Sequence, residues 1–349
     1  MAEYRFQFPI WRDQKLSINV SSARFTVFSE TSFDEVVGTV YAYAKPGKDH
    51  VELVLNSMLA DCLKTEFPDV SKLDVSQHAI QLPDYYRSFI ILAGHDQYIL
   101  RTTNDYSYDD KMLVGAVPWT LIRHELDIRM PLVIHCVADY ASESNLEVRA
   151  LFGNGAASPS RQVQMPVNEI SGTVSFVLYG KADEIFGAKD NVHVSEIQIL
   201  SAVGNSVDYP HIKVLNTGLR YALYYVDAYG YWRWLTVAGR VKRSESYQRQ
   251  TFKSSNDNSG PSGREAINYL NSITKTYEFS TGWLSDGQAA LMHHLLGSVN
   301  VMLYDMEDES FTPVVIMDSS CEYKTYKGEG CGPVTYTVTA QVAKDFVRK

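Results

Sequence analysis

The stretch TGWLSDGQAALMHHLLGSVNVMLYDME, residues 281–307, contains the clearest fold signals in the chain. Ser285 followed three residues later by Gln288 is a capping box, in which the hydroxyl accepts a bond from a first-turn amide and the glutamine reaches back. An apolar face then recurs at helical spacing, formed by Ala289, Met292, Leu295 and Leu296. Gly297 is placed to end the helix in the left-handed conformation, and VNVMLYD follows as a strand. The stretch predicts a helix laid on an antiparallel sheet.

Two features of the same stretch are candidates for chemistry. His293 and His294 are adjacent, so on a helix they point about 100° apart. Helical metal ligands lie four residues apart, and neither HExxH nor HxxxH occurs here. The acidic run from Asp305 to Glu309 falls at a strand end and is most simply a solvated turn. We therefore expect no metal or acid–base site in this stretch.

Most of the remaining sequence has strand patterning. Residues 24–30 and 36–44 alternate, and a short strand from Val51 runs into a predicted helix of about three turns before Pro68. The segments RSFIILAG, DQYILRTTN, PLVIHCVADY, LEVRALFG, GTVSFVLYG and HVSEIQILSAV are short strands separated by turn residues. This punctuation predicts a β-sandwich or jelly-roll-like module over residues 75–205.

Longer strands follow from residue 211, with AYGYW as a tight hairpin and residues 254–265 as a polar loop. The predicted fold is mainly β (α+β), with a β-sandwich at 75–205 and an antiparallel sheet with a flanking helix at 211–349. The strands and helix of residues 1–70 are expected to complete the C-terminal sheet. No apolar run is long enough for a transmembrane helix, and the N-terminus has no signal-peptide core, so synthesis in the cytoplasm is expected.

Composition narrows the function classes. The net charge of −9 argues against a nucleic-acid binder, which normally presents a basic face. The four cysteines lack C-x-x-C spacing, which argues against a zinc knuckle. A hairpin would bring Cys321 and Cys331 opposite each other for a disulfide, but a reducing compartment favours free thiols. The 23 tyrosines favour strands and interfaces, because an aromatic side chain buries a large area and keeps a polar tip.

No catalytic motif emerges. His135 and Cys136 are neighbours in an apolar strand, so they point to opposite faces and cannot form a local Cys–His pair; a buried cysteine and a half-exposed histidine are expected. The glycine pairs at 153–155 and 328–330 fit turns, not phosphate-binding loops. There is no G-x-S-x-G elbow. We predict no catalytic residue, no metal and no cofactor.

Aromatic and basic side chains gather near the hairpin. Trp232 and Trp234 share one strand face, and Tyr231 and Arg233 share the other. A core or subunit-interface role is favoured over an aromatic platform for sugar rings. A basic cluster, Arg240, Lys242, Arg243 and Arg249, fits an acidic surface of a neighbouring subunit or a solvated strand face. The predicted interface residues are Tyr229, Tyr231, Trp232, Trp234, Arg240 and Arg243.

Residues 219–349 resemble tail proteins encoded by phages and prophages of Bacteroides-like bacteria. Their hairpin motif "YYxNxxGGW" is matched by Tyr224, Tyr225, Gly230 and Trp232, and their helix start "TGWLsdee" by residues 281–285. Residues 313–320 are similar to "PVxItDsS", residues 324–327 and 336–338 to "KTYKNqG…YTI", and residues 105–108 to "NDWSY".

This resemblance implies a non-enzymatic distal-tail or baseplate component that links the tail to the adsorption apparatus. It implies a tail-tube-like domain that forms a homo-oligomeric ring, such as a hexamer, around the tail channel. The expected partners are copies of itself, other tail proteins and a host surface glycan, and the expected location is the virion tail. The alternative is a carbohydrate-binding β-sandwich protein acting in host-receptor recognition. A glycoside hydrolase is the third option, and it requires two carboxylates across a cleft.

Overall fold

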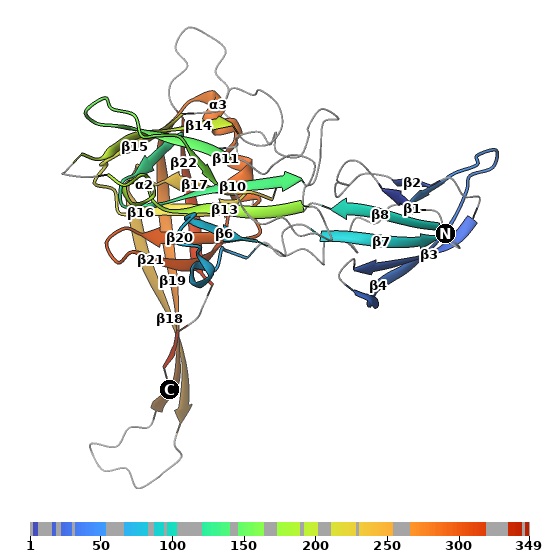
Figure 1. Cartoon of the computed structure of the whole chain (residues 1–349). Coiled ribbons are helices and arrows are strands. Elements are labelled where there is room, and N and C mark those ends of the chain that lie inside the picture. Colours follow the sequence, from blue (N-terminus) through green and yellow to red (C-terminus); the bar gives the residue numbers. More distant parts are fainter. Residues whose placement is uncertain are drawn as a thin grey trace, which may run out of the picture. The chain divides into compact units, whose positions relative to one another are not determined.

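The structure is a computed structural model of a mainly β protein (Figure 1). It describes residues 3–5, 16–18, 22–29, 32–53, 66–82, 87–93, 96–102, 121–139, 146–163, 173–188, 192–201, 211–227, 230–253, 266–318, 334–343 and 346–348. The chain forms two compact units. Unit 1 comprises residues 1–217 with 226–234, and unit 2 comprises residues 218–225 with 235–349. No helix in the described part is long and apolar enough to cross a membrane.

The N-terminal strands of unit 1 form a sheet with strands from residues 87–102. Its order is β1 (Glu3–Arg5), β8 (Asp96–Thr102), β7 (Arg87–Ala93), β3 (Ser22–Ser29) and β4 (Ser32–Tyr43), and only the β1–β8 pair is parallel. A separate pair, β2 (Leu16–Ile18) and β5 (Val51–Leu53), packs on one face of this sheet. The expectation that residues 1–70 complete the C-terminal sheet is therefore corrected for every described strand of that segment, because their hydrogen-bonding partners lie elsewhere.

The N-terminal sheet and the β2–β5 pair enclose a small core. Apolar residues alternate along its strands, as expected for a sheet with one covered face. Phe25 and Val27 of β3 and Phe89 of β7 are fully buried against Val51 of β5. A tight turn follows β4, in which the Lys48 amide donates to the Lys45 carbonyl at 2.9 Å. Most of the helix predicted before Pro68 lies outside the described residues.

Two further sheets complete unit 1. One has the order β10 (Pro131–Asp139), β13 (Thr173–Lys181) and β6 (Ala79–Gln81). The other has the order β12 (Arg161–Val163), β11 (Leu146–Phe152), β14 (Val194–Ser201), β15 (Ile212–Leu215) and β9 (Glu125–Asp127). The strands predicted in residues 131–201 are confirmed. The short helices η1 (Val70–Lys72) and α2 (Ala182–Phe186) connect strands.

Unit 2 is built on one long sheet. Its order is β17 (Trp232–Thr236), β16 (Tyr221–Val226), β20 (Val301–Asp305), β21 (Ser310–Ile316), β22 (Val334–Val342), β19 (Ala266–Leu284) and β18 (Val241–Lys253). A short strand, β23 (Phe346–Arg348), also pairs with β19. The tip of the β16–β17 hairpin, residues 226–234, belongs to unit 1.

The predicted capping box is confirmed. The Gln288 amide donates to Ser285 Oγ at 3.3 Å, and the Ser285 amide donates to Gln288 Oε1 at 2.9 Å. The helix is divided at Leu291 into α3 (Asp286–Ala290) and α4 (Met292–Leu296). The predicted apolar face is buried at Ala289, Met292 and Leu295 and half-buried at Leu296.

The predicted left-handed end at Gly297 is wrong. Its φ of −88° and ψ of 2° continue a helix-like turn, and its amide donates to the His293 carbonyl at 2.9 Å. A Cβ at this position would lie 3.0 Å from the His293 carbonyl oxygen. Close approach of the backbone, not the sign of φ, therefore explains the glycine.

Candidate functional site

The two histidines of α4 have different surroundings. His293 is exposed, with Nδ1 at 2.6 Å from the Ala290 carbonyl oxygen, whereas His294 is buried. The predicted difference in direction is thus confirmed, although the two ring centroids lie only 3.9 Å apart. Across the described ranges, no group of three or more His, Cys, Asp or Glu side chains is arranged to hold a metal ion.

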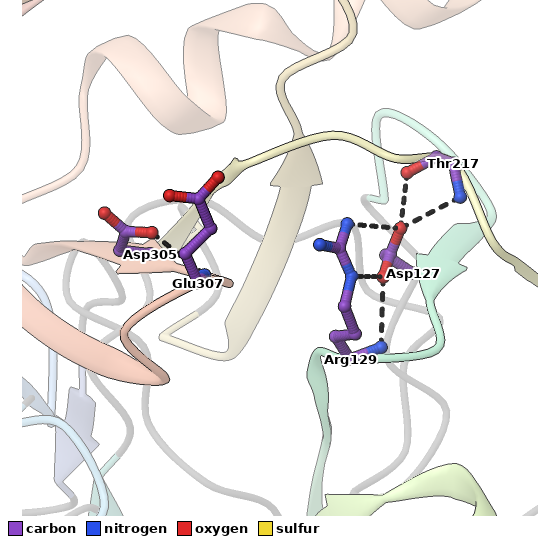
Figure 2. A network of polar contacts seen from close by, with 5 residues as sticks. All are labelled: Asp127, Arg129, Thr217, Asp305 and Glu307. Carbon is purple, nitrogen blue, oxygen red and sulfur yellow. Dashed lines mark hydrogen bonds and ion pairs between the residues drawn. The ribbon is translucent and has the colours of Figure 1, made fainter.

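The acidic run after β20 is a turn, as predicted. Asp305 Oδ1 accepts a bond from the Glu307 amide at 3.0 Å, which Figure 2 draws. Arg220 neutralises both carboxylates, with Nη2 at 2.9 Å from Asp305 and Nη1 at 2.7 Å from Glu307. The carboxylates of this turn therefore stabilise a strand end.

A buried ion pair organises the hairpin tip. Arg233 Nε lies 3.1 Å from Asp227 Oδ2, and both side chains are at most 2% exposed. Asp227 Oδ1 also accepts from the Tyr231 amide at 2.8 Å, and the Gly230 amide donates to the Asp227 carbonyl at 3.0 Å. Gly230 has a φ of 81°, which favours glycine in this tight turn. These hydrogen bonds close the hairpin, so the Asp227–Arg233 ion pair stabilises the hairpin tip.

His135 is buried, so the prediction of a half-exposed side chain is wrong. Its Nδ1 accepts from the Trp232 amide at 3.3 Å, and its ring lies 4.8 Å from that of Tyr231. Burial, followed by the positive charge of Arg233, lowers the pKa of His135 to about 3. A histidine that stays neutral and bonds a backbone amide acts as a core residue.

The predicted interface tryptophans are core residues. Trp232 and Trp234 are both fully buried within the chain, because every residue of β17 is covered. The Trp234 indole donates to the Glu125 carbonyl at 2.8 Å, and Phe67 packs edge-on against Trp232. The side chains therefore form neither an exposed interface nor a sugar platform. Tyr231 lies half-buried on the other face, with the Arg233 guanidinium 5.3 Å from its ring centroid.

Sequence reasoning missed a second buried carboxylate in unit 1, shown in Figure 2. Asp127 accepts from Arg129 Nε at 2.9 Å, from the Arg129 amide at 3.0 Å and from both the amide and the hydroxyl of Thr217. Burial raises the pKa of Asp127, but the bonds from Arg129 and Thr217 outweigh it and hold the pKa below its ordinary value. The contacts between Asp127 and Arg129 form a local turn, which the sequence indicates. The contacts with Thr217 come from a distant segment of the chain.

Strand β18 of the β18–β19 ribbon is exposed to solvent. Residues 242–251 of β18 are all exposed, on both faces. Lys242 pairs with Glu278 at 3.1 Å, and Arg243 pairs with Glu245 at 2.7 Å. The Tyr247 hydroxyl also donates to Glu245 at 2.6 Å. The charges of Lys242 and Arg243 are thus matched within the ribbon, as on a solvated strand face.

Arg240 is exposed at the base of the ribbon. The contacts of Arg240 and Arg243 with a neighbouring subunit remain predictions.

Other predictions fall outside the described residues: Tyr229, Cys321, Cys331, the loop 254–265, the glycines of 328–330 and the motif at 105–108. Comparison of the chain with protein-family models, curated proteins and solved structures gives no match.

Proposed function

We propose that this protein is a non-enzymatic structural subunit of a phage tail tip that assembles into a ring with copies of itself. The observation that carries the proposal is the β18–β19 ribbon, which runs on beyond the neighbouring strands of its sheet (Figure 1). The resemblance of residues 219–349 to distal-tail proteins supports the tail-tip part of the proposal.

The far part of the ribbon explains why a partner is expected. Among the described residues, the pairs from Gln250–Leu270 to Lys253–Ala266 join β18 to β19 without a third strand, whereas β23 and β22 pair with β19 from residue 271 onward. An isolated two-stranded ribbon is marginally stable in water. Its outer edges carry N–H and C=O groups that a strand or surface of another chain can satisfy.

Ring formation follows from the direction of such a contact. A ribbon that docks on a different surface of the next subunit makes a head-to-tail contact, and head-to-tail contacts close into rings when the rotation permits. The charges of Lys242 and Arg243 are already matched by Glu278 and Glu245, so the contact would rest mainly on backbone pairing and on uncharged side chains such as Tyr247.

Mass photometry and negative-stain imaging of the purified protein test the proposal. The expected result for the native chain is a discrete ring. Replacement of residues 250–270 by Asn-Gly, a dipeptide suited to a two-residue hairpin turn, connects Arg249 to Asn271, which face each other in the register. This variant keeps the β23 pairing and is expected to be monomeric, with unchanged circular dichroism.

The matched control removes only the loop. Replacement of residues 254–265 by Asn-Gly connects Lys253 to Ala266, another facing pair, and preserves the whole ribbon. Rings should persist in this variant. A native chain that stays monomeric at high concentration would refute the proposal, as would rings that survive the loss of residues 250–270.

A further inference from the structure

The outer face of the N-terminal sheet carries two tyrosines. Tyr41 and Tyr43 of β4 are 65% and 77% exposed. They are two residues apart on one strand, so they project from the same face with a spacing of about 7 Å. The opposite face holds the core formed with β2 and β5, to which Val40 and Ala42 contribute.

An exposed cation lies beside this tyrosine pair. Arg24 of β3 is directly opposite Tyr41 in the register, which places the two Cβ atoms about 5 Å apart, with Tyr43 as a diagonal neighbour. Arg24 makes no ion pair with any residue that the structure describes. Lys45, two residues beyond Tyr43, is by contrast paired with Glu52 at 3.2 Å.

We propose that Arg24, Tyr41 and Tyr43 form a binding face for an anionic polysaccharide built from uronic acid units. Each unit of such a chain has a ring face of C–H groups that can lie on a tyrosine ring. Each also has a carboxylate, which a guanidinium binds through two parallel hydrogen bonds. The exposed Thr39 lies on the same strand face and adds a hydroxyl for the sugar hydroxyl groups.

The charge of the face selects among ligand classes. A cationic ligand would be repelled by Arg24, although aromatic faces alone attract cations. A neutral glycan would use the tyrosines and leave the guanidinium without a carboxylate partner. An anionic glycan uses both. This inference does not depend on the proposed ring, because the face lies in unit 1 and the assembly ribbon in unit 2.

Calorimetric titration of the full chain with oligogalacturonate tests the proposal. Binding is expected, and it should weaken as sodium chloride is raised, because the Arg24 contact is screened by salt. Tyr41→Ala and Tyr43→Ala should each weaken binding about tenfold, as the loss of one stacking ring does in comparable sites. Arg24→Gln should weaken it at least about tenfold and abolish the salt dependence, while Arg24→Lys should restore part of it.

Controls separate this site from folding and from other anions. Tyr41→Phe and Tyr43→Phe keep the aromatic side chain that stacks on the sugar and should bind more tightly than the alanine variants. Tyr247→Ala removes a similarly exposed tyrosine from the ribbon and should bind oligogalacturonate as the native chain does. Absence of oligogalacturonate binding would overturn the proposal. So would unchanged binding in the Tyr41→Ala/Tyr43→Ala double variant, or equally tight binding of poly-glutamate, oligothymidylate or malto-oligosaccharide. A loss of rings with intact sugar binding would overturn only the proposed assembly.

Discussion

Acidification should weaken unit 1 through His135. In the folded chain this histidine is buried beside Arg233 and has a pKa of about 3, compared with 6.5 for a free side chain. Protonation would place a second positive charge next to Arg233 and turn Nδ1, which accepts from the Trp232 amide, into a donor. Below pH 6.5 the unfolded chain therefore binds a proton at His135 that the folded chain does not bind. The free energy of unfolding consequently falls as the pH falls.

The size of the effect follows from the two pKa values. Each pKa unit corresponds to about 1.4 kcal/mol, so the interval from 6.5 to about 3 amounts to about 5 kcal/mol when fully crossed. Between pH 7.5 and pH 5.0 only the part from 6.5 down to 5.0 is crossed. His135 should then reduce the free energy of unfolding by about 2 kcal/mol.

Urea unfolding at pH 7.5 and pH 5.0, followed by tryptophan fluorescence, measures this loss, because Trp232 and Trp234 are buried in the same unit. His135→Gln keeps an acceptor for the Trp232 amide but does not titrate. Its loss of stability between the two pH values should be smaller than that of the native chain by about 2 kcal/mol. The exposed His211→Gln serves as the control and should follow the native chain. Equal losses in the native chain and His135→Gln would refute the reasoning.

Two further substitutions test the packing. Asp227→Asn removes the carboxylate that pairs with the buried Arg233 guanidinium, and it should reduce the free energy of unfolding in urea by about 3–5 kcal/mol. The Asp227→Asn/Arg233→Met double variant should recover part of this loss. A change below about 0.5 kcal/mol would contradict a stabilising role of the ion pair. Gly239→Ala should reduce the free energy of unfolding by about 1–3 kcal/mol and lower the melting temperature, because the new Cβ would lie 2.6 Å from the Ser280 Cβ. Gly287→Ala is the matched control, since nothing lies within 4 Å of its Cβ, and it should be neutral or slightly stabilising; equal effects at both glycines would refute the steric argument.

Local signals in the sequence determined much of unit 2. The capping box at Ser285, the apolar helix face and the strand after Gly297 are all present, because each depends on residues within a few positions of one another. The alternation around Trp232 likewise assigned side chains to the correct strand faces. The uninterrupted helix and the left-handed glycine were not correct: the helix is divided at Leu291, and Gly297 is explained by the close approach of the His293 carbonyl oxygen.

The partners of each strand were decided by the tertiary structure. Strand patterning in residues 22–43 is plain in the sequence, but the pairing of β3 with β7 joins distant residues, from Ser29 with Phe89 to Phe25 with Ala93, in a register that no local pattern encodes. The same reason explains the buried groups. His135, Asp227 and Asp127 look like ordinary polar residues in the sequence. His135 stays neutral because the folded chain buries it and places Arg233 beside it. Asp227 and Asp127 are paired with Arg233 and Thr217 in the folded chain.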